Sequence, residues 1–214
     1  MSSARADILA KIRQALKSPS PPKTYPQSPV DGFFAKGNED DLAIIFGQSF
    51  TAKSGQLIFV DSYEDYYAEL LKLVETRGWL NMACWEPDLA TSLTYVGIPF
   101  ATDDKDLHEV EASFTLCEAL VARTGSILVS SAQGAGRRLT IYPPVHIVVA
   151  TTSQLVADIA EGLEVVRLRY PSRYPSMVSL VSGPSRTADI EKTLVMGAHG
   201  PKELILFLID DSAQ

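Results

Sequence analysis

The stretch that decides the fold is Leu204-Ile205-Leu206-Phe207-Leu208-Ile209, a continuous apolar run near the end of the sequence. A second run of this kind is Val145-His146-Ile147-Val148-Val149-Ala150. A strand with one solvent-exposed face alternates apolar and polar residues, whereas continuous apolar runs are typical of a mostly parallel sheet that is covered on both faces. These runs predict an α/β fold of the doubly wound kind.

Working outward, the pattern alternates between strand-like and helix-like segments. We expect strands at residues 57–60, 82–85, 127–130 and 178–181, and helices at residues 40–50, 62–77, 153–162 and 187–196. Ser62 followed by Asp65 resembles a capping box, Gly78 can end that helix, and Pro87 suits the first turn of another. The alternation supports a single α/β domain over residues 31–214.

An appendage of different composition precedes that domain. Residues 5–17 have the periodicity of an amphipathic helix, with Ile8, Leu9 and Ile12 on one face. Five of the 13 prolines follow within residues 18–29, which predicts an extended linker. We therefore expect residues 1–30 to be a helix and a linker. The helix could dock on its own domain, on a partner or on a second subunit.

Composition narrows the function classes. The 214 residues include 19 basic and 26 acidic side chains, for a net charge of −7, which argues against broad nucleic-acid binding. The N-terminus has no apolar signal core, and no apolar run approaches the ~20 residues of a membrane span. We expect a soluble, cytoplasmic protein.

The cysteine and histidine inventory excludes several kinds of chemistry. Two cysteines, Cys84 and Cys117, cannot build a four-cysteine iron–sulfur site, and without CxxC spacing they are expected to be reduced, packed thiols. The three histidines have no metal-ligand spacing, so no metal site is expected. There is also no GxSxG elbow and no phosphate-binding GxxxxGK[ST] loop, which argues against a classical hydrolase or ATPase.

Four polar segments could bind a ligand, because open α/β sheets bind ligands at the carboxyl ends of their strands. They share hydroxyl groups, glycines or basic side chains. The candidate ligand-binding residues are Thr124, Gly125, Ser126, Arg138, Ser182, Gly183, Ser185, Arg186 and Thr187, and the candidate proton-transfer residue is His199. Hydroxyl and guanidinium groups donate hydrogen bonds to carboxylates and phosphates, so we expect a small anion.

Each segment also has a purely structural interpretation. Thr124 to Ser126 could be a tight turn, the Gln133-Gly134-Ala135-Gly136-Arg137-Arg138 loop a solvated hairpin tip, and His199 part of a helix C-cap. In the third segment, Ser185 or Thr187 would cap the helix expected from residue 187, and its free N–H groups could bind an anion. His146 is expected to be a buried, hydrogen-bonded group rather than a catalyst.

Taken together, these motifs resemble the lactate utilization protein C family, which has a LUD domain. The resemblance covers roughly residues 40–210. It lies in Thr124-Gly125-Ser126, in Arg138 ahead of Pro143-Pro144-Val145-His146, in the string from Ser182 to Glu191, and in Gly197-Ala198-His199-Gly200-Pro201. It implies a three-layer α/β sandwich like NagB, RpiA and the CoA transferases. It also implies a role in oxidation of L-lactate to pyruvate, beside separate partner subunits that carry the iron–sulfur clusters. This chain would bind no cofactor of its own.

One departure from the family pattern concerns charge. The family usually has Glu-Thr-Gly-Thr where this chain has Arg123-Thr124-Gly125-Ser126. If relatives use that glutamate as a base or a ligand contact, its role is absent or altered here, unless Glu118 replaces it.

Three functions remain open from the sequence. The chain could be a lactate-oxidation subunit that binds a small anion. It could be a stand-alone enzyme of the CoA-transferase, sugar-phosphate isomerase or folate cyclo-ligase kind. It could also be a non-catalytic assembly module that uses its N-terminal helix.

Overall fold

The apolar run near the end of the chain forms β11 (Glu203–Ile209), a strand inside a five-stranded sheet. This computed structural model describes residues 4–16, 42–103, 105, 107–188, 194–196 and 199–212. The strand order is β1-β11-β6-β3-β2, and every pairing is parallel. The other strands are β1 (Gln56–Val60), β6 (Val145–Thr151), β3 (Ala112–Thr115) and β2 (Met82–Cys84).

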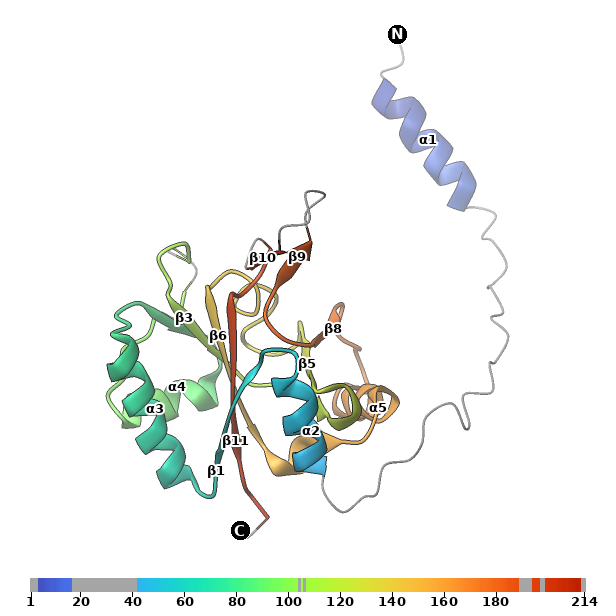
Figure 1. Ribbon diagram of the computed structural model, residues 1–214. Coiled ribbons are helices and arrows are strands. Elements are labelled where there is room, and N and C mark those ends of the chain that lie inside the picture. Colours follow the sequence, from blue (N-terminus) through green and yellow to red (C-terminus); the bar gives the residue numbers. More distant parts are fainter. Residues whose placement is uncertain are drawn as a thin grey trace. The chain divides into compact units, whose positions relative to one another are not determined.

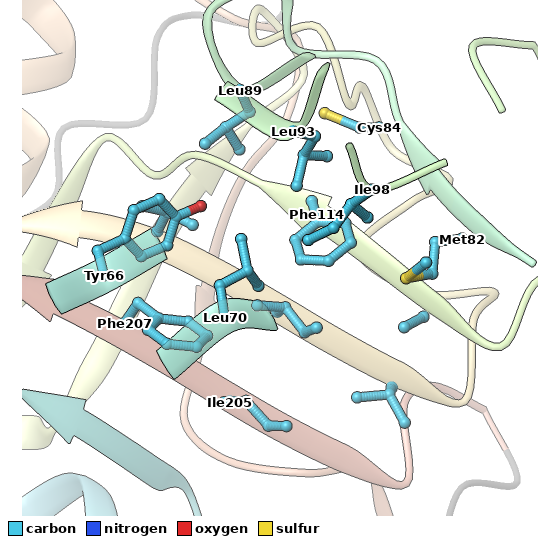
Figure 2. Close-up of a cluster of buried hydrophobic side chains, with 14 of the residues drawn as sticks. Tyr66, Leu70, Met82, Cys84, Leu89, Leu93, Ile98, Phe114, Ile205 and Phe207 are labelled. Atoms are coloured by element: carbon cyan, nitrogen blue, oxygen red, sulfur yellow. The ribbon is translucent and has the colours of Figure 1, made fainter. Parts of the chain in front are cut away.

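Helices α3 (Tyr63–Arg77) and α4 (Pro87–Tyr95) cover one face of this sheet. Ile205 and Phe207 of β11 belong to this core, and the Phe207 ring meets Tyr66 of α3 edge-on at 5.3 Å between ring centroids (Figure 2). Burying a side chain of this size contributes roughly 1.5–3 kcal/mol. The alternate residues Leu206 and Leu208 face the opposite side, so both faces of β11 are buried.

The second face is covered by α2 (Leu42–Thr51) and by a separate four-stranded sheet of order β7-β4-β5-β8. Its strands are β7 (Leu155–Val156), β4 (Ala119–Val121), β5 (Ser126–Ser130) and β8 (Val178–Val181). Helix α5 (Ile159–Arg169) packs Val166 against Leu128 on the outer face of this smaller sheet. The expected α/β class with a mostly parallel central sheet between covering layers is therefore confirmed.

Two expected strands lie in this second sheet and not in the parallel one. Residues 127–130 and 178–181 pair antiparallel with each other, in β5 and β8. β5 is covered on both faces, by the central sheet and by α5, and burial rather than parallel pairing explains its apolar sequence. β8 is an edge strand whose residues are half-buried, with Leu180 exposed.

Two expected helices are wrong in whole or in part. Residues 153–162 contain the 3-10 turn η3 (Thr152–Gln154), then β7, and α5 begins only at Ile159, where the Asp158 side chain caps it. Residues 187–196 contain parts of β9 (Arg186–Ala188) and β10 (Leu194–Met196), which pair antiparallel; residues 189–193 lie outside the described residues. The described residues directly after Ser185 form a strand, so the helix expected from residue 187 does not begin there and the anion site expected at its start is not formed.

The local helix signals are confirmed where they are strongest. Ser62 caps α3 by accepting a hydrogen bond from the Asp65 N–H. Gly78 ends the helix with a left-handed φ of 65°, and Pro87 stands in the first turn of α4.

The thiols and the N-terminal helix also follow expectation. Cys84 and Cys117 are free and buried, and burial raises their pKa to about 11 and about 12. Residues 1–35 form a unit by themselves, in which α1 (Ala4–Leu16) is helical; the proline-rich stretch lies outside the described residues. Within the described ranges, no helix is both long and apolar enough to traverse a lipid bilayer.

Candidate functional site

Two loops that are far apart in sequence meet through serine side chains. β5 and β8 pair antiparallel with Ile127 opposite Val181, so Ser126 at the start of β5 lies beside Ser182, which follows β8. Their Oγ atoms are 2.6 Å apart, within hydrogen-bond distance. Ser126 is buried, whereas Ser182 is exposed, so the pair reaches from the core to the surface.

Glycines let both loops approach the end of α2. Gly125 has a φ of 52°, and a Cβ there would lie 2.3 Å from the backbone nitrogen of Phe50. Gly183 has a φ of 116°, and a Cβ there would lie 2.5 Å from the carbonyl oxygen of Lys53. Only glycine permits both the backbone conformation and the approach. The two glycines thus bring the loops against the residues between α2 and β1.

Two cationic side chains join the loops at this point. The Lys53 ammonium donates to the carbonyl oxygen of Thr124. The Arg186 guanidinium donates to the carbonyl oxygen of Lys53 at 3.2 Å and also to the hydroxyl of Ser54. Neither cation pairs with a carboxylate among the residues that the structure describes. We call this group the serine cluster, and its members are Lys53, Thr124, Ser126, Ser182, Ser185 and Arg186.

The cluster contains one buried hydroxyl that lacks a protein partner. Thr124 Oγ1 is buried and makes no hydrogen bond to any described residue. Buried polar atoms are normally satisfied. Together with the two unpaired cations, this hydroxyl leaves the cluster with spare hydrogen-bonding capacity for an anion.

The fourth predicted segment reaches the cluster through its backbone. The Ser185 N–H donates to the carbonyl oxygen of Pro201 at 2.8 Å, and Gly200 lies against the Ser185 side chain. His199 is exposed beside this turn. Thr187 lies in β9, and its side chain is outside what the structure describes.

The serine cluster lies at the amino edge of the parallel sheet, where the strands begin. Lys53 and Ser54 precede β1, and Pro201 precedes β11; β9 extends from the same end (Figure 1). The expectation that these residues gather at the carboxyl ends of the parallel strands is wrong. It fails because Ser182 follows β8, which belongs to the separate smaller sheet and not to the parallel one.

The carboxyl edge of the parallel sheet is acidic and internally satisfied. Thr152 Oγ1 donates to Asp210 at 3.1 Å and to Asp211 at 2.8 Å, and the Ser153 N–H donates to Asp211 at 2.9 Å. Burial alone would raise the pKa of Asp211, but hydrogen bonds from Ser153 and Thr152 lower it to about 2. An anion would meet negative charge at this edge.

Arg138 is not part of the serine cluster. Its guanidinium lies over the Trp85 ring, 5.4 Å from the centroid. In the same loop, the N–H groups of Gly134 and Ala135 donate to the buried carboxylate of Glu86 at 2.9 and 3.0 Å. The glycine-rich loop therefore binds a carboxylate, as its composition suggests, but that carboxylate belongs to the protein.

Arg123, where the resemblance leads us to expect a glutamate, makes an internal ion pair. Its guanidinium donates to both oxygens of Asp158, at 3.1 and 2.7 Å, and these hydrogen bonds hold the pKa of Asp158 below its usual range. Asp158 in turn caps α5. Arg123 thus positions the helix, and its charge is compensated.

Glu118 is not placed to take the role of a glutamate at position 123. It is buried, and its carboxylate accepts hydrogen bonds from Ser130 at 2.6 Å, from Tyr170 at 3.0 Å and from Arg169. Ser130 ends β5, four residues beyond Ser126, or ~13 Å along an extended strand. Glu118 therefore lies far from the serine cluster.

His146 is buried in β6 as expected. Its Nε2 is 2.8 Å from the hydroxyl of Thr115, and burial lowers its pKa to about 4, which keeps the ring neutral near pH 7. Its Nδ1 has no partner among the described residues, so the expected satisfaction of the ring is incomplete.

Lys53 and Ser54 were not identified from the sequence, and Glu118 was considered only as a replacement for a glutamate at position 123. Lys53-Ser54-Gly55 precedes the apolar run of residues 57–60, a signal that could have drawn attention to the amino edge. Glu118 interrupts an apolar stretch, where a charged side chain needs partners. Within the described ranges, no three His, Cys, Asp or Glu side chains gather as a metal site requires.

The fold and the cluster define an α/β protein with a cationic, hydroxyl-rich surface at the amino edge of its sheet. The LUD domain model matches residues 100–209, just over half of the chain. A lactate utilization protein C of Shouchella clausii is 33% identical over 202 residues, which cover 87% of this chain and 87% of that protein. The chain belongs to the LUD domain family.

Other relatives match over a shorter stretch. An uncharacterized protein of Neisseria meningitidis is 37% identical over 100 residues, 47% of this chain and 42% of its own length. The lactate utilization protein C of Bacillus subtilis is 28% identical over 109 residues, 50% of this chain and 45% of its own. These matches thus span less than half of each relative.

A solved structure shows the same fold. The crystal structure of a DUF162 family protein from Deinococcus radiodurans has a TM-score of 0.58 with 18% identity. The similarity covers 78% of this chain and 96% of that one.

Proposed function

We propose that this chain takes part in lactate utilization by binding a small carboxylate anion at the serine cluster. Relatives that bear the name lactate utilization protein C support the pathway. The observation that carries the site is that Lys53 and Arg186 lie together, since the Arg186 guanidinium donates to the backbone carbonyl oxygen of Lys53. Neither side chain has a carboxylate partner among the described residues, although the protein has a net charge of −7.

The cluster offers the donors that a carboxylate needs. Arg186 uses one guanidinium nitrogen for its contacts with Lys53 and Ser54, so further N–H groups remain for a ligand. The exposed Ser182 hydroxyl, backed by Ser126, is a neutral donor beside them. A carboxylate here would replace hydration with charge-assisted hydrogen bonds, the stronger kind.

In this proposal the chain binds and orients the anion, and redox cofactors lie elsewhere. Oxidation of L-lactate to pyruvate releases two electrons and two protons, and partner subunits with iron–sulfur clusters would accept the electrons. Both cysteines here are buried, protonated thiols that supply no cluster ligands. His199, exposed next to the Gly200–Pro201 turn, is the candidate for moving a proton at the rim.

The test is calorimetric titration of the full chain with pyruvate and with L-lactate. We expect Arg186→Gln and Lys53→Met each to weaken binding about tenfold, the loss of one charge-assisted contact. Arg167→Gln is the matched control, because Arg167 pairs with Glu164 on the outer surface of α5. Absence of binding by the unmodified chain, or equal weakening in the control, would falsify the site.

A second role concerns α1. Its Ile8, Leu9 and Ile12 side chains are exposed, and an apolar helical face of this kind can bind another subunit. Deletion of residues 1–30 would then abolish co-purification with the partner subunits while leaving pyruvate binding intact. Retained assembly after the deletion would exclude this role.

A further inference from the structure

A second cationic site lies around a hollow where β5 ends and β8 begins, apart from the serine cluster. The hollow has a volume of about 370 Å³, and its lining comprises Ser131, Ala132, Arg173, Tyr174, Pro175 and Ser176. Small-molecule pockets typically have volumes of about 300–1,000 Å³. Ser131 directly follows β5, while residues 173–176 lead into β8, so the hollow is four to five residues along β5 from Ser126.

The walls of the hollow are cross-linked by hydrogen bonds. The Ser131 N–H donates to the carbonyl oxygen of Met177 at 3.0 Å, and the Met177 N–H donates to Ser131 Oγ at 3.1 Å. The hydroxyls of Ser131 and Ser176 are 3.2 Å apart. Pro175, which directly precedes Ser176, is buried and restricts the backbone there. The site is thus formed before any ligand arrives.

Two arginines make the hollow cationic. Arg137 donates from Nη2 to Ser176 Oγ at 2.8 Å, and Arg173 is an exposed member of the lining. Within the described part of the chain, neither one forms an ion pair with a carboxylate. The nearby Glu118 does not neutralise them, because its oxygens are bonded to Arg169, Tyr170 and Ser130.

We infer that this hollow binds a phosphate monoester. A monoester carries a charge of about −1.5 to −2 at pH 7, which two guanidinium groups match and a single carboxylate does not. Its oxygens accept from forked guanidinium donors and from the serine hydroxyls. The exposed Tyr174 ring gives the rest of the molecule a surface to pack on. The volume accommodates a body larger than lactate.

The test titrates the full chain with glycerol 3-phosphate, with uncharged glycerol as the reference. We expect saturable binding of the phosphate ester only. Arg173→Gln should weaken it about tenfold and Arg137→Gln by a similar factor, whereas Arg167→Gln should leave it unchanged. Arg173 makes no hydrogen bond or ion pair to another described residue, so its substitution should not disturb folding; equal thermal unfolding midpoints check this.

The outcomes separate this site from the serine cluster. Arg186→Gln should leave glycerol 3-phosphate binding unchanged, and Arg173→Gln should leave pyruvate binding unchanged. The inference is overturned if the unmodified chain does not bind glycerol 3-phosphate at millimolar concentration. It is also overturned if Arg167→Gln weakens binding as much as Arg173→Gln, which would indicate non-specific attraction.

Discussion

The two edges of the parallel sheet differ in charge although the same strands supply both. At the carboxyl edge, Asp210 and Asp211 are bonded to Thr152 and to the Ser153 N–H. At the amino edge, Lys53 and Arg186 contact backbone oxygens and hydroxyls and pair with no carboxylate among the described residues. The amino edge also has a compensated pair, Arg77 with Glu203 at the start of β11. The edges differ because Lys53 and Arg186 have no carboxylate partner among the described residues.

This difference teaches that uncompensated charge is a better guide to the ligand site here than strand direction. Open α/β sheets commonly bind ligands at the carboxyl ends of their strands. In this chain the smaller, mixed sheet brings the Ser182 loop to the opposite edge. The following experiments perturb one edge and use the other as the reference.

The largest effect is expected for Gly125→Ala at the amino edge. A side chain there would combine left-handed strain with a clash against the Phe50 backbone, for a loss of about 4 kcal/mol in the free energy of unfolding. Gly136→Ala is the matched control, because its φ of 59° is similar but its surroundings are open; we expect a loss of about 1 kcal/mol. Urea unfolding measures both, and equal losses would contradict the close approach to α2.

As the pH falls, the free energy of unfolding should first respond to His146, near the amino edge of the sheet, and only at lower pH to Asp211 at the carboxyl edge. His146, the second residue of β6, has its pKa lowered by burial from 6.5 to about 4, so the unfolded chain binds its proton first. The free energy of unfolding should then fall by roughly 3 kcal/mol as the pH falls from 6.5 to 4. Asp211 keeps its charge to about pH 2 and adds nothing in this window.

Denaturant titrations across this pH range test the assignment. His146→Gln should remove most of the pH dependence, whereas His108→Gln, at an exposed position, should keep it. If the unmodified chain and His146→Gln have the same slope, His146 is not the group responsible.

A serine substitution at each edge isolates the contribution of the hydroxyls. Ser182→Ala removes the shorter of two hydrogen bonds of the buried Ser126, which also donates to the carbonyl oxygen of Thr124 at 3.3 Å. It should cost about 1 kcal/mol of stability and weaken pyruvate binding several-fold. Ser153→Ala removes a comparable contact with Thr151 at the carboxyl edge and should leave binding unchanged. Calorimetry on both variants decides; equal affinities would mean that the Ser126–Ser182 pair is only structural.

The smallest effect is expected for Asp211→Asn. Asparagine keeps a side-chain oxygen that can still accept from Thr152 and from the Ser153 N–H, so the loss of stability should be about 0.5 kcal/mol. Pyruvate affinity should not change. A clear fall in affinity would show that the carboxyl edge takes part in binding.

The sequence predicted the parallel sheet well because strands that are buried on both faces, such as β6 and β11, need a continuous run of apolar residues. Helix ends at Ser62 and Gly78 were predictable for a similar reason, since capping depends on a few adjacent residues. The same pattern could not distinguish β5 from a parallel strand, because β5 is also buried on both faces, and four residues of β8 are too few to show its pairing. The β9–β10 pair was missed because its strands are three residues long.

The candidate site was predictable residue by residue but not as an assembly. Polar residue types identified the Thr124–Ser126 and Ser182–Arg186 loops. Which of them meet depends on the register of β5 with β8, which is set by tertiary pairing. For the same reason Arg138, which looked equivalent to Arg186, lies over Trp85 instead.

The most direct test of the central claim is a titration of the isotope-labelled full chain with pyruvate, followed by amide resonances. We predict saturable shifts for Ser126, Gly183 and Ser185 at the amino edge, with Ser153 and Asp211 unchanged. Saturable shifts at Ser153 and Asp211, with the amino edge silent, would contradict the account.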